Sequence, residues 1–372
     1  MRSLAGRWHK VRNGLLANAR FQRWVASFPL TQALARRHAH AVFDLCAGFV
    51  YSQVLFACVR LKLFDALANA PQSRLQLSEQ LNLSADAVDR LMAAAASLRL
   101  VERCDGDRFA LGIYGAALVA NPSLAAMIEH HAMLYADLRD PVALLRGERG
   151  GTHIAHFWPY AHGLEPRALT TERTQPYTDL MSQSQGLIAD DVLDAYPFEN
   201  CSCLLDVGGG NGTFLIAVGA RHPKLQLKLF DLPAVAGIAQ VKLTEARLDT
   251  RAQAFGGNFL TDPLPSRADI ITLIRIVHDH DDETVLTLLK AIRGAIRDDG
   301  VLLVAEPMSG THGAERIADA YFGFYLLAMG SGRPRSSAAI GKLLQQAGFA
   351  RCRAIPTRRP FLTQLIAAYP NP

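Results

Sequence analysis

The feature that most constrains this chain is a glycine-rich segment between an apolar run and a helical one. It reads LLDVGGGNGTFL, from Leu204 to Leu215, and its spaced glycines are Gly208, Gly210 and Gly212. Glycine has no Cβ, so the backbone of such a turn can approach a ligand closely. The spacing G-x-G-x-G differs from the G-x-G-x-x-G dinucleotide fingerprint and suits a ligand without a pyrophosphate. A strand, a glycine turn and a helix in this order predict a nucleotide-type binding loop.

Two acidic residues accompany this loop. Asp206 lies two residues before the first glycine, where its carboxylate can reach a cationic amino-acid end of the ligand. Asp231 ends the next expected strand, roughly 20 residues on, where an acid takes ribose hydroxyls. The loop and the two acids together favour a binding site over a purely structural turn.

From Cys203 onward, short apolar runs alternate with helical patterns. This alternation predicts a doubly wound α/β sheet, entered by a helix over residues 176–195. The expected strands are residues 203–207, 226–230, 251–255, 270–274, 301–305, 350–355 and 362–368.

The preceding stretch is mostly helical and contains a winged-helix pattern. Its second helix, expected over residues 85–98 with Ser84 as N-cap, has Ala93–Ala96 in its middle and so offers no bidentate contact to a base edge. We therefore expect a dimerisation role rather than nucleic-acid binding. The other expected elements are helices over 41–61 and 63–68, a hairpin over 100–111, a helical stretch over 121–146 and a loop over 147–163.

The first 43 residues form a basic arm. They hold eight Lys and Arg residues and no acid before Asp44, together with Trp8, Phe21, Trp24 and Phe28. Four interpretations stay open: packing on a partner subunit, docking on an anionic membrane surface, nucleic-acid binding, or targeting. The most apolar run, residues 46–59, is interrupted by two polar residues, so no membrane-spanning helix is expected.

The cysteines and histidines decide whether disulfides or a metal site are expected. Six cysteines in 372 residues form no disulfide framework, so we expect reduced thiols and a cytoplasmic location. The pairs His130–His131 and His153–His156 lack carboxylate or Cys partners at ligand spacing, and we expect no metal site.

Several motifs resemble, in order, the plant-type family of class I S-adenosylmethionine-dependent O-methyltransferases. The resemblance covers about residues 40–369 and implies S-adenosyl-L-methionine as cofactor. It adds cofactor contacts to the loop and Asp231: Leu232 in the ribose segment FDLP, Asn258 and Phe259 in GGNF at the adenine, and Arg267 in place of an adenine-side Lys.

The same resemblance assigns the catalytic residues. In IVHDH, residues 276–280, His278 is the base and Asp279 adjoins it, while Glu306 orients the imidazole. The family's second His-flanking acid is missing, because Pro334 stands in its place. Glu315 is a replacement by sequence position alone. His280 also departs from the family pattern, which has Trp there.

Three segments narrow the resemblance further. Residues 28–65, 128–135 and 156–160 resemble bacterial carotenoid O-methyltransferases of the hydroxyneurosporene or demethylspheroidene type. That implies a lipophilic substrate, an acyclic carotenoid methylated on its tertiary hydroxyl, and a homodimer with peripheral contact to the inner or photosynthetic membrane. Alternatives are phenol, polyketide or quinone O-methylation, a tetrapyrrole C-methyltransferase relative, and a non-catalytic winged-helix regulator. The expected domains are residues 1–40 (arm), 41–175 (dimerisation) and 176–372 (catalysis).

Overall fold

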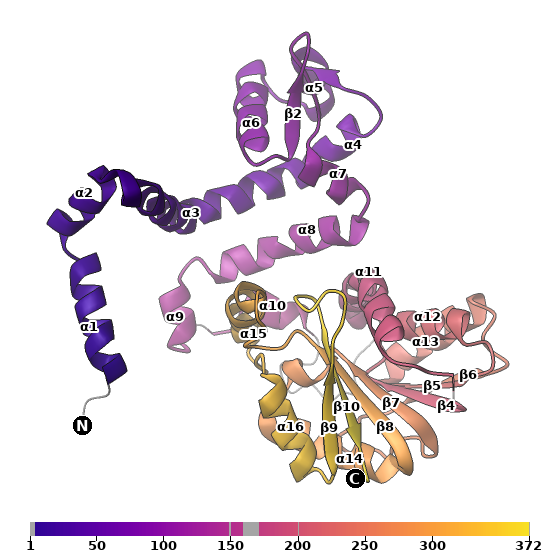
Figure 1. Ribbon diagram of the computed structural model, residues 1–372. Helices are drawn as coiled ribbons and strands as arrows, with labels where there is room; N and C mark the ends of the chain where they lie inside the picture. The colour runs from indigo at the N-terminus through magenta and orange to yellow at the C-terminus, as the bar shows by residue number, and fades with distance from the viewer. Residues whose placement is uncertain (1–3, 149, 159–170, 200, 372) are drawn as a thin grey trace. The chain divides into compact units, whose positions relative to one another are not determined.

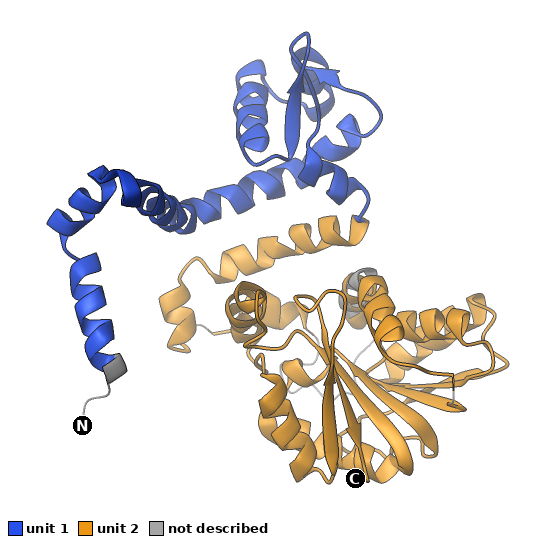
Figure 2. Cartoon of the chain, viewed as in Figure 1, with its two compact units in different colours: residues 1–121 blue, residues 122–372 orange. Residues whose placement is uncertain are grey.

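A computed structural model describes residues 4–148, 150–158, 171–199 and 201–371 (Figure 1). The chain divides into two compact units, residues 1–121 and 122–372 (Figure 2). The domain boundaries expected at residues 40 and 175 stay predictions.

The N-terminal unit begins with three helices. The basic arm forms α1 and α2, and Asn18 caps α2 by accepting from the backbone N–H of Arg20 at 2.8 Å. The long helix expected from residue 41 starts at Pro29, because proline suits a first turn and no Gly or Pro follows before Gly48. The bounds are α1 Leu4–Leu16, α2 Ala19–Ser27 and α3 Pro29–Arg60.

The winged helix follows as expected. Ser84 caps α6 by accepting from the Ala87 N–H at 3.2 Å. A short strand missed by the sequence pattern joins the hairpin, giving a sheet in the order β1–β3–β2. The bounds are α4 Leu63–Leu67, β1 Gln72–Ser73, α5 Arg74–Leu81, α6 Ala85–Ser97, β2 Val101–Cys104, β3 Arg108–Leu111 and α7 Ile113–Val119.

Among its described residues, the C-terminal unit opens with four helices. The loop expected over residues 147–163 contains a short helix, because Asp137 accepts from the N–H groups of His153 and Ile154 at 2.8 and 2.9 Å. Residues 159–163 of that loop lie outside the described residues. The bounds are α8 Pro122–Asp137, α9 Pro141–Leu145, α10 His153–Phe157 and α11 Thr171–Ala195.

A seven-stranded sheet forms the centre of this unit, in the order β6–β5–β4–β7–β8–β10–β9. All seven expected strands are present; β10 runs antiparallel to β8 and β9, and the other pairs are parallel. The bounds are β4 Cys203–Val207, β5 Gln226–Asp231, β6 Ala252–Gly256, β7 Ala268–Ile274, β8 Ile296–Glu306, β9 Arg351–Ile355 and β10 Gln364–Tyr369.

Helices cover both faces of the sheet, as the doubly wound pattern predicts (Figure 1). One face packs on α11, α12 and α13, and the other on α14 and α16, each through its own apolar core. The carboxyl ends of the parallel strands share one edge, where ligands bind in such sheets. The bounds are α12 Thr213–Arg221, α13 Pro233–Glu245, α14 Asp282–Ala295, α15 Gly323–Met329 and α16 Ser337–Gln346, with a π-helix over Arg316–Phe322.

Candidate active site

The glycine loop lies at the carboxyl edge of the sheet and leads into α12. Gly208, Gly210 and Gly212 have φ of +72°, +57° and +82°, a conformation that favours glycine. A Cβ at Gly208 would collide with the Ile276 side chain, whereas one at Gly210 would meet no atom within 4 Å. The loop therefore approaches the segment after β7 closely and leaves room for a ligand at its middle.

Asp206 ends up beneath this loop. Its Oδ1 accepts from the Thr272 hydroxyl at 2.7 Å, while its Oδ2 is buried without a hydrogen-bond partner among the described residues. Burial raises the pKa of Asp206 to about 7. The hydrogen bond from Thr272 lowers this pKa, and the charge of Asp231 raises it further. A buried carboxylate in this state gains free energy when a cationic group binds beside it.

Asn211, which the sequence analysis did not single out, carries the complementary group. Its Oδ1 accepts from the Thr213 hydroxyl at 2.7 Å, and its Nδ2 is a buried donor left unbonded by the described residues. An unbonded acceptor on Asp206 and an unbonded donor on Asn211 fit the ammonium and carboxylate of an amino-acid group. S-adenosylmethionine has such an end.

Asp231 and Leu232 follow β5 at the same edge. The Asp231 carboxylate accepts from the N–H of Gly210 at 2.8 Å and from the N–H of Leu232 at 2.7 Å. Burial raises its pKa to about 6, although these two bonds lower it. Asp231 thus fixes the loop, and each oxygen keeps a lone pair for a ribose hydroxyl.

The predicted adenine contacts lie beside Asp231. Gly257 donates to the Asp231 carbonyl at 2.9 Å, which places the following Asn258 and Phe259 next to the loop. Phe259 meets the His280 ring edge-to-face, with centroids 5.4 Å apart. His280 therefore joins this aromatic wall in the position where the family has Trp.

Arg267 is not brought to this edge. It precedes β7, and its exposed side chain lies at the amino end of the sheet. The glycine loop follows the carboxyl end of β4, which runs parallel to β7. The seven residues of β7 span about 23 Å, more than an arginine side chain can bridge. The prediction that Arg267 contacts the adenine is therefore contradicted by the strand topology.

His278 and Glu306 form a buried pair at the ends of β7 and β8. Glu306 Oε1 accepts from the N–H groups of Ile276 and Val277 at 2.9 and 2.6 Å, and its Oε2 meets His278 Nδ1. Every oxygen of Glu306 is thus committed. This arrangement holds the proton on Nδ1 and directs Nε2 away from the sheet.

Asp279 supplies a second acid. Its Oδ1 lies 3.0 Å from His278 Nε2 and has no other partner among the described residues. Glu315 is exposed, with His312 as its neighbour, and does not reach the imidazole. Asp279 and Glu306 therefore flank the His278 ring, one at each nitrogen.

The charge of the two acids determines the protonation of His278. Burial by itself would lower the pKa of the imidazole, but the carboxylates of Asp279 and Glu306 outweigh it and raise the pKa to about 10. His278 is thus a stronger base than free histidine, held in one orientation.

The segment around Pro334 still supports the site. Gly332, with φ +76°, packs so closely on the His278 carbonyl that a Cβ would collide with it. Arg335 is buried and donates to the carbonyls of Val277 and His280 at 2.7 Å each. Sequence reasoning missed Arg335, whose only signal was its place in this motif.

His130 and His131 each contact a tyrosine hydroxyl. His130 Nε2 lies 2.8 Å from the Tyr325 hydroxyl and His131 Nε2 lies 2.9 Å from that of Tyr321. Across the described ranges, no group of three or more His, Cys, Asp or Glu could hold a metal ion.

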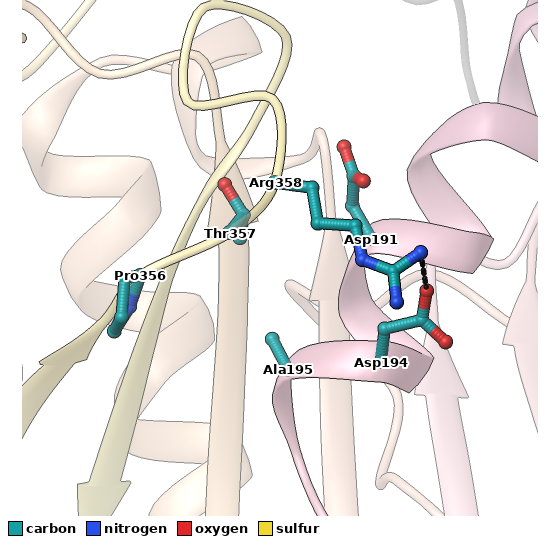
Figure 3. A pocket seen from close by; sticks show the side chains of 6 residues that line it. All are labelled: Asp191, Asp194, Ala195, Pro356, Thr357 and Arg358. Atoms are coloured by element: carbon teal, nitrogen blue, oxygen red, sulfur yellow. Dashed lines mark ion pairs between the residues drawn. The ribbon is translucent and has the colours of Figure 1, made fainter.

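A hollow of about 210 Å³ lies between α11 and the β9–β10 loop (Figure 3). None of its lining residues belongs to the sites described above. The lining consists of Asp191, Asp194, Ala195, Pro356, Thr357 and Arg358.

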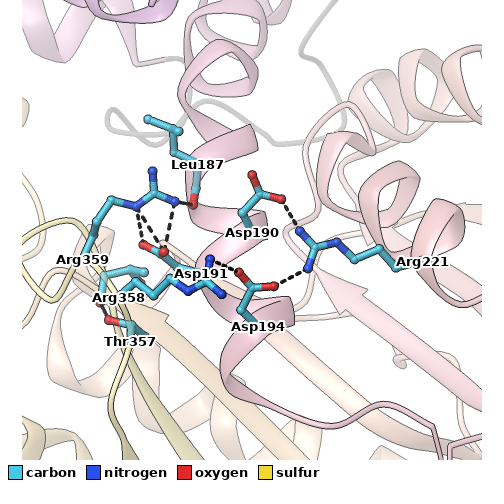
Figure 4. Close-up of polar contacts among 9 residues, drawn as sticks. Leu187, Asp190, Asp191, Asp194, Arg221, Thr357, Arg358 and Arg359 are labelled. Carbon is cyan, nitrogen blue, oxygen red and sulfur yellow. Dashed lines mark hydrogen bonds and ion pairs between the residues drawn. The ribbon is translucent and has the colours of Figure 1, made fainter. Parts of the chain in front are cut away.

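Ion pairs surround this hollow and fix α11 (Figure 4). Arg359 pairs with Asp191 at 3.0 Å, and Arg221 at the end of α12 pairs with Asp190 and Asp194. Nearer the start of α11, Gln185 accepts from Arg275 at 2.9 Å, and Arg275 directly precedes the His278 turn. The network therefore anchors the helix that supports the turn.

Comparisons with known proteins show the family of this chain. The O-methyltransferase domain model matches residues 135–350, and the O-methyltransferase dimerisation domain model matches residues 43–125. The chain belongs to the O-methyltransferase family. It is 42% identical to the demethylspheroidene O-methyltransferase of Cereibacter sphaeroides over 95% of this chain and 93% of that protein.

Two further relatives extend the comparison. The demethylspheroidene O-methyltransferase of Rhodobacter capsulatus is 41% identical, over 91% of this chain and 84% of that one. Among solved structures, CalO1, a methyltransferase in calicheamicin biosynthesis in its SAH-bound form, superposes with a TM-score of 0.75 at 25% identity. That match covers 90% of this chain and 98% of CalO1. This chain is thus an enzyme of the methyltransferase class with the family's fold.

Proposed function

We propose that this enzyme transfers a methyl group from S-adenosylmethionine to the tertiary hydroxyl of an acyclic carotenoid. The observation that carries the acceptor is the identity of 42% and 41% to two demethylspheroidene O-methyltransferases over most of each chain. The cofactor is supported by the SAH-bound relative and by the unbonded polar groups of Asp206 and Asn211 beside the glycine loop.

Four groups would hold the cofactor. Asp206 and Asn211 would take its amino-acid end, Asp231 its ribose, and Phe259 the adenine. When bound, S-adenosylmethionine supplies the methyl group as an electrophile. Asp231→Ala removes acceptors whose hydrogen bonds are worth about 1.5–3 kcal/mol each when charged, so it should weaken cofactor affinity in calorimetry. Unchanged affinity would remove Asp231 from the site.

His278 would take the hydroxyl proton at Nε2. An aliphatic alcohol has a pKa near that of water, about 15.7, so an ordinary imidazole at ~6.5 faces a gap of about nine units, roughly 12 kcal/mol. With the pKa of His278 raised to about 10, the gap counted from the neutral imidazole is about six units, or roughly 8 kcal/mol. At neutral pH the ring carries a proton on Nε2 as well, so it acts as the base only after losing that proton. The proton therefore leaves as the O–CH3 bond forms, and alignment of the reacting atoms supplies further acceleration.

Acceptor feeding tests this proposal. Purified enzyme with labelled S-adenosylmethionine should methylate a hydroxylated acyclic carotenoid faster than a phenol, polyketide or quinone. Removal of the protein from its host should cause the unmethylated carotenoid alcohol to accumulate. Methylation of a phenol alone would overturn the proposed acceptor while leaving the reaction class intact.

The assembly we propose is a homodimer built through the 43–125 domain. Large apolar side chains on α3 are exposed in the single chain, among them Phe43, Leu45 and Phe49. Among the described residues, α3 is also the one helix long and apolar enough to cross a membrane, which is weak evidence at this position near the N-terminus. Burial of these residues against a second copy accounts for the same composition. Sedimentation equilibrium at low concentration should show the dimer.

We propose that the basic arm docks on an anionic membrane surface, because a carotenoid substrate resides in the membrane. Trp8 and Trp24 are 64% and 55% exposed on α1 and α2, among basic residues. Cationic and aromatic side chains bind headgroups, and salt weakens the attraction. Deletion of residues 1–37 should reduce sedimentation with anionic vesicles and spare cofactor binding. Full-length protein that ignores such vesicles at low salt would leave the arm as a dimer-packing element.

A further inference from the structure

A continuous row of rings leads away from the catalytic histidine. The rings of His278 and Phe322 have centroids 5.7 Å apart, and Phe322 is followed by Tyr321 at 5.1 Å. Tyr321 is followed by His131 at 5.5 Å, and His131 by Tyr135 at 6.1 Å. We call Phe322, Tyr321, His131 and Tyr135 the front row. All four residues are half-buried, so each is still partly accessible.

Behind the front row lies a second, buried layer. Tyr325, His130 and Trp158 are each less than 8% exposed. The Trp158 indole donates to the Tyr325 hydroxyl at 3.2 Å, and that hydroxyl lies 2.8 Å from His130 Nε2. A hydroxyl that accepts from the indole completes its bonding by donating to the imidazole. We call these three residues the back network.

The back network is tied to the front row through the π-helix and α15. Tyr321 lies one helical turn before Tyr325, and their ring centroids are 5.9 Å apart. Tyr321 and Phe322 both belong to a π-helix. Such helices are rare in proteins and, where they occur, are frequently found at functional sites. The hydrogen bond of His131 to Tyr321 fixes the same segment from α8. Displacement of Tyr325 would therefore move Phe322 relative to His278.

The front row carries no charge. Burial lowers the pKa of His131, and it lowers the pKa of His130 to about 4 with help from the neighbouring His131. Neutral rings in a line present apolar edges and faces, which pack well against a flat conjugated chain. A row that begins at the base and extends away from it suits an acceptor whose hydroxyl is at its end.

We propose that the front row is the surface on which the long unsaturated chain of the acceptor lies, and that the back network is a positioning device that holds this row against His278. This proposal rests on the proposed function and specifies where its acceptor binds. Tyr325 then acts through Phe322 and does not touch the reacting atoms.

The test compares two tyrosine variants that each lose one hydroxyl. Tyr325→Phe breaks the back network. Tyr196→Phe is the matched control, because Tyr196 bonds to Tyr369 at the opposite edge of the sheet. Acceptors are a hydroxylated acyclic carotenoid and a short tertiary alcohol with the same end group. Calorimetry measures cofactor affinity, and thermal unfolding reports the fold.

Tyr325→Phe should lower kcat/KM for the carotenoid by about ten- to a hundredfold, the scale of a small misplacement, with a smaller loss for the short alcohol. Cofactor affinity should stay within about twofold in both variants, and Tyr196→Phe should match the parent. His130→Gln keeps an acceptor for the Tyr325 hydroxyl and should retain activity. His130→Leu should behave like Tyr325→Phe.

Two results would overturn the proposal. One is Tyr325→Phe activity within twofold of the parent on the carotenoid. The other is an equal loss for long and short acceptors together with weakened cofactor binding, the pattern of a general folding defect. Failure of the proposed function looks different: the parent itself would methylate no carotenoid alcohol.

Discussion

His278 and His130 are both buried histidines of the C-terminal unit, yet their environments shift the pKa in opposite directions. His278 lies between the carboxylates of Glu306 and Asp279, which outweigh burial and raise its pKa to about 10. His130 faces the Tyr325 hydroxyl, and burial with His131 nearby lowers its pKa to about 4. The same side chain is thus a strong base in one place and a neutral hydrogen-bond acceptor in the other.

The difference lies in the neighbours and not in the depth of burial. Burial penalises the charged form of either imidazole, and only a nearby opposite charge reverses that penalty. A histidine prepared for proton transfer therefore needs its acids in contact. A histidine that holds aromatic rings in place needs neutral partners.

The largest effect should come from His278→Ala. Removal of a general base costs roughly two to four powers of ten in turnover, while cofactor affinity and folding should persist. Steady-state kinetics and calorimetry check this. His130→Gln is the matched change at the other histidine and should keep the chemistry. If His278→Ala turned over within a few-fold of the parent, the reaction would need only the proximity of its reactants, and His278 would not be the base.

Glu306→Gln should have the next largest effect. The amide presents an N–H to His278 Nδ1, which forces the proton onto Nε2 and removes the base. We expect a loss of roughly ten- to a thousandfold in kcat, with KM little changed, as for wrong tautomers in other His–acid pairs. Normal kcat would show that Glu306 serves the fold alone.

Asp279→Asn should lower the pKa of His278 and so bring it nearer to that of His130. Loss of a negative charge next to Nε2 lowers the pKa of His278, so the rising limb of kcat/KM against pH should move to lower pH. Glu315→Gln, which changes an exposed acid away from the imidazole, should leave the limb in place. An unmoved limb in Asp279→Asn would mean that this acid does not act on His278.

The smallest effect concerns stability against pH. His278 has a folded pKa above 6.5, so its contribution is full below about pH 6.5 and is lost as pH rises toward about 10. His130 has a folded pKa below 6.5, so its contribution is present above that pH and is lost as pH falls toward about 4.

Urea unfolding across pH checks both signs. His278→Gln should flatten the alkaline loss of stability, and His130→Gln should flatten the acidic loss. Each variant is compared with the parent, because Asp206 and Asp231 also affect the free energy of unfolding in the acidic range. Their pKa values are raised to about 7 and about 6, so their contribution to stability is lost as pH rises through that range. Parallel curves for a variant and the parent would contradict the corresponding assignment.

Much of the catalytic unit was predictable because its signals are local. The seven strands, the glycine loop before α12 and the helix cap at Ser84 follow from short-range patterns. Motif order also brought His278 and Glu306 to neighbouring strand ends. Arg267 was misplaced, because a motif match says nothing about which end of a strand a residue occupies.

Other features depended on contacts between distant segments. Asp279 faces Nε2 because the turn of residues 277–280 is held by Arg335, more than 50 residues later. The early start of α3 at Pro29 was hidden by the polar residues of the arm. The π-helix over Arg316–Phe322 has no sequence pattern that separates it from an α-helix.

The sequence by itself determined the fold class and the kind of ligand loop, since periodicity and glycine spacing act within a few residues of one another. Only the tertiary structure decided which acids lie against the His278 ring, where Arg267 lies, and which of the two histidines is charged. The environment of His130, for example, depends on a contact of 2.8 Å with the Tyr325 hydroxyl, 195 residues away, and a local pattern does not encode such contacts.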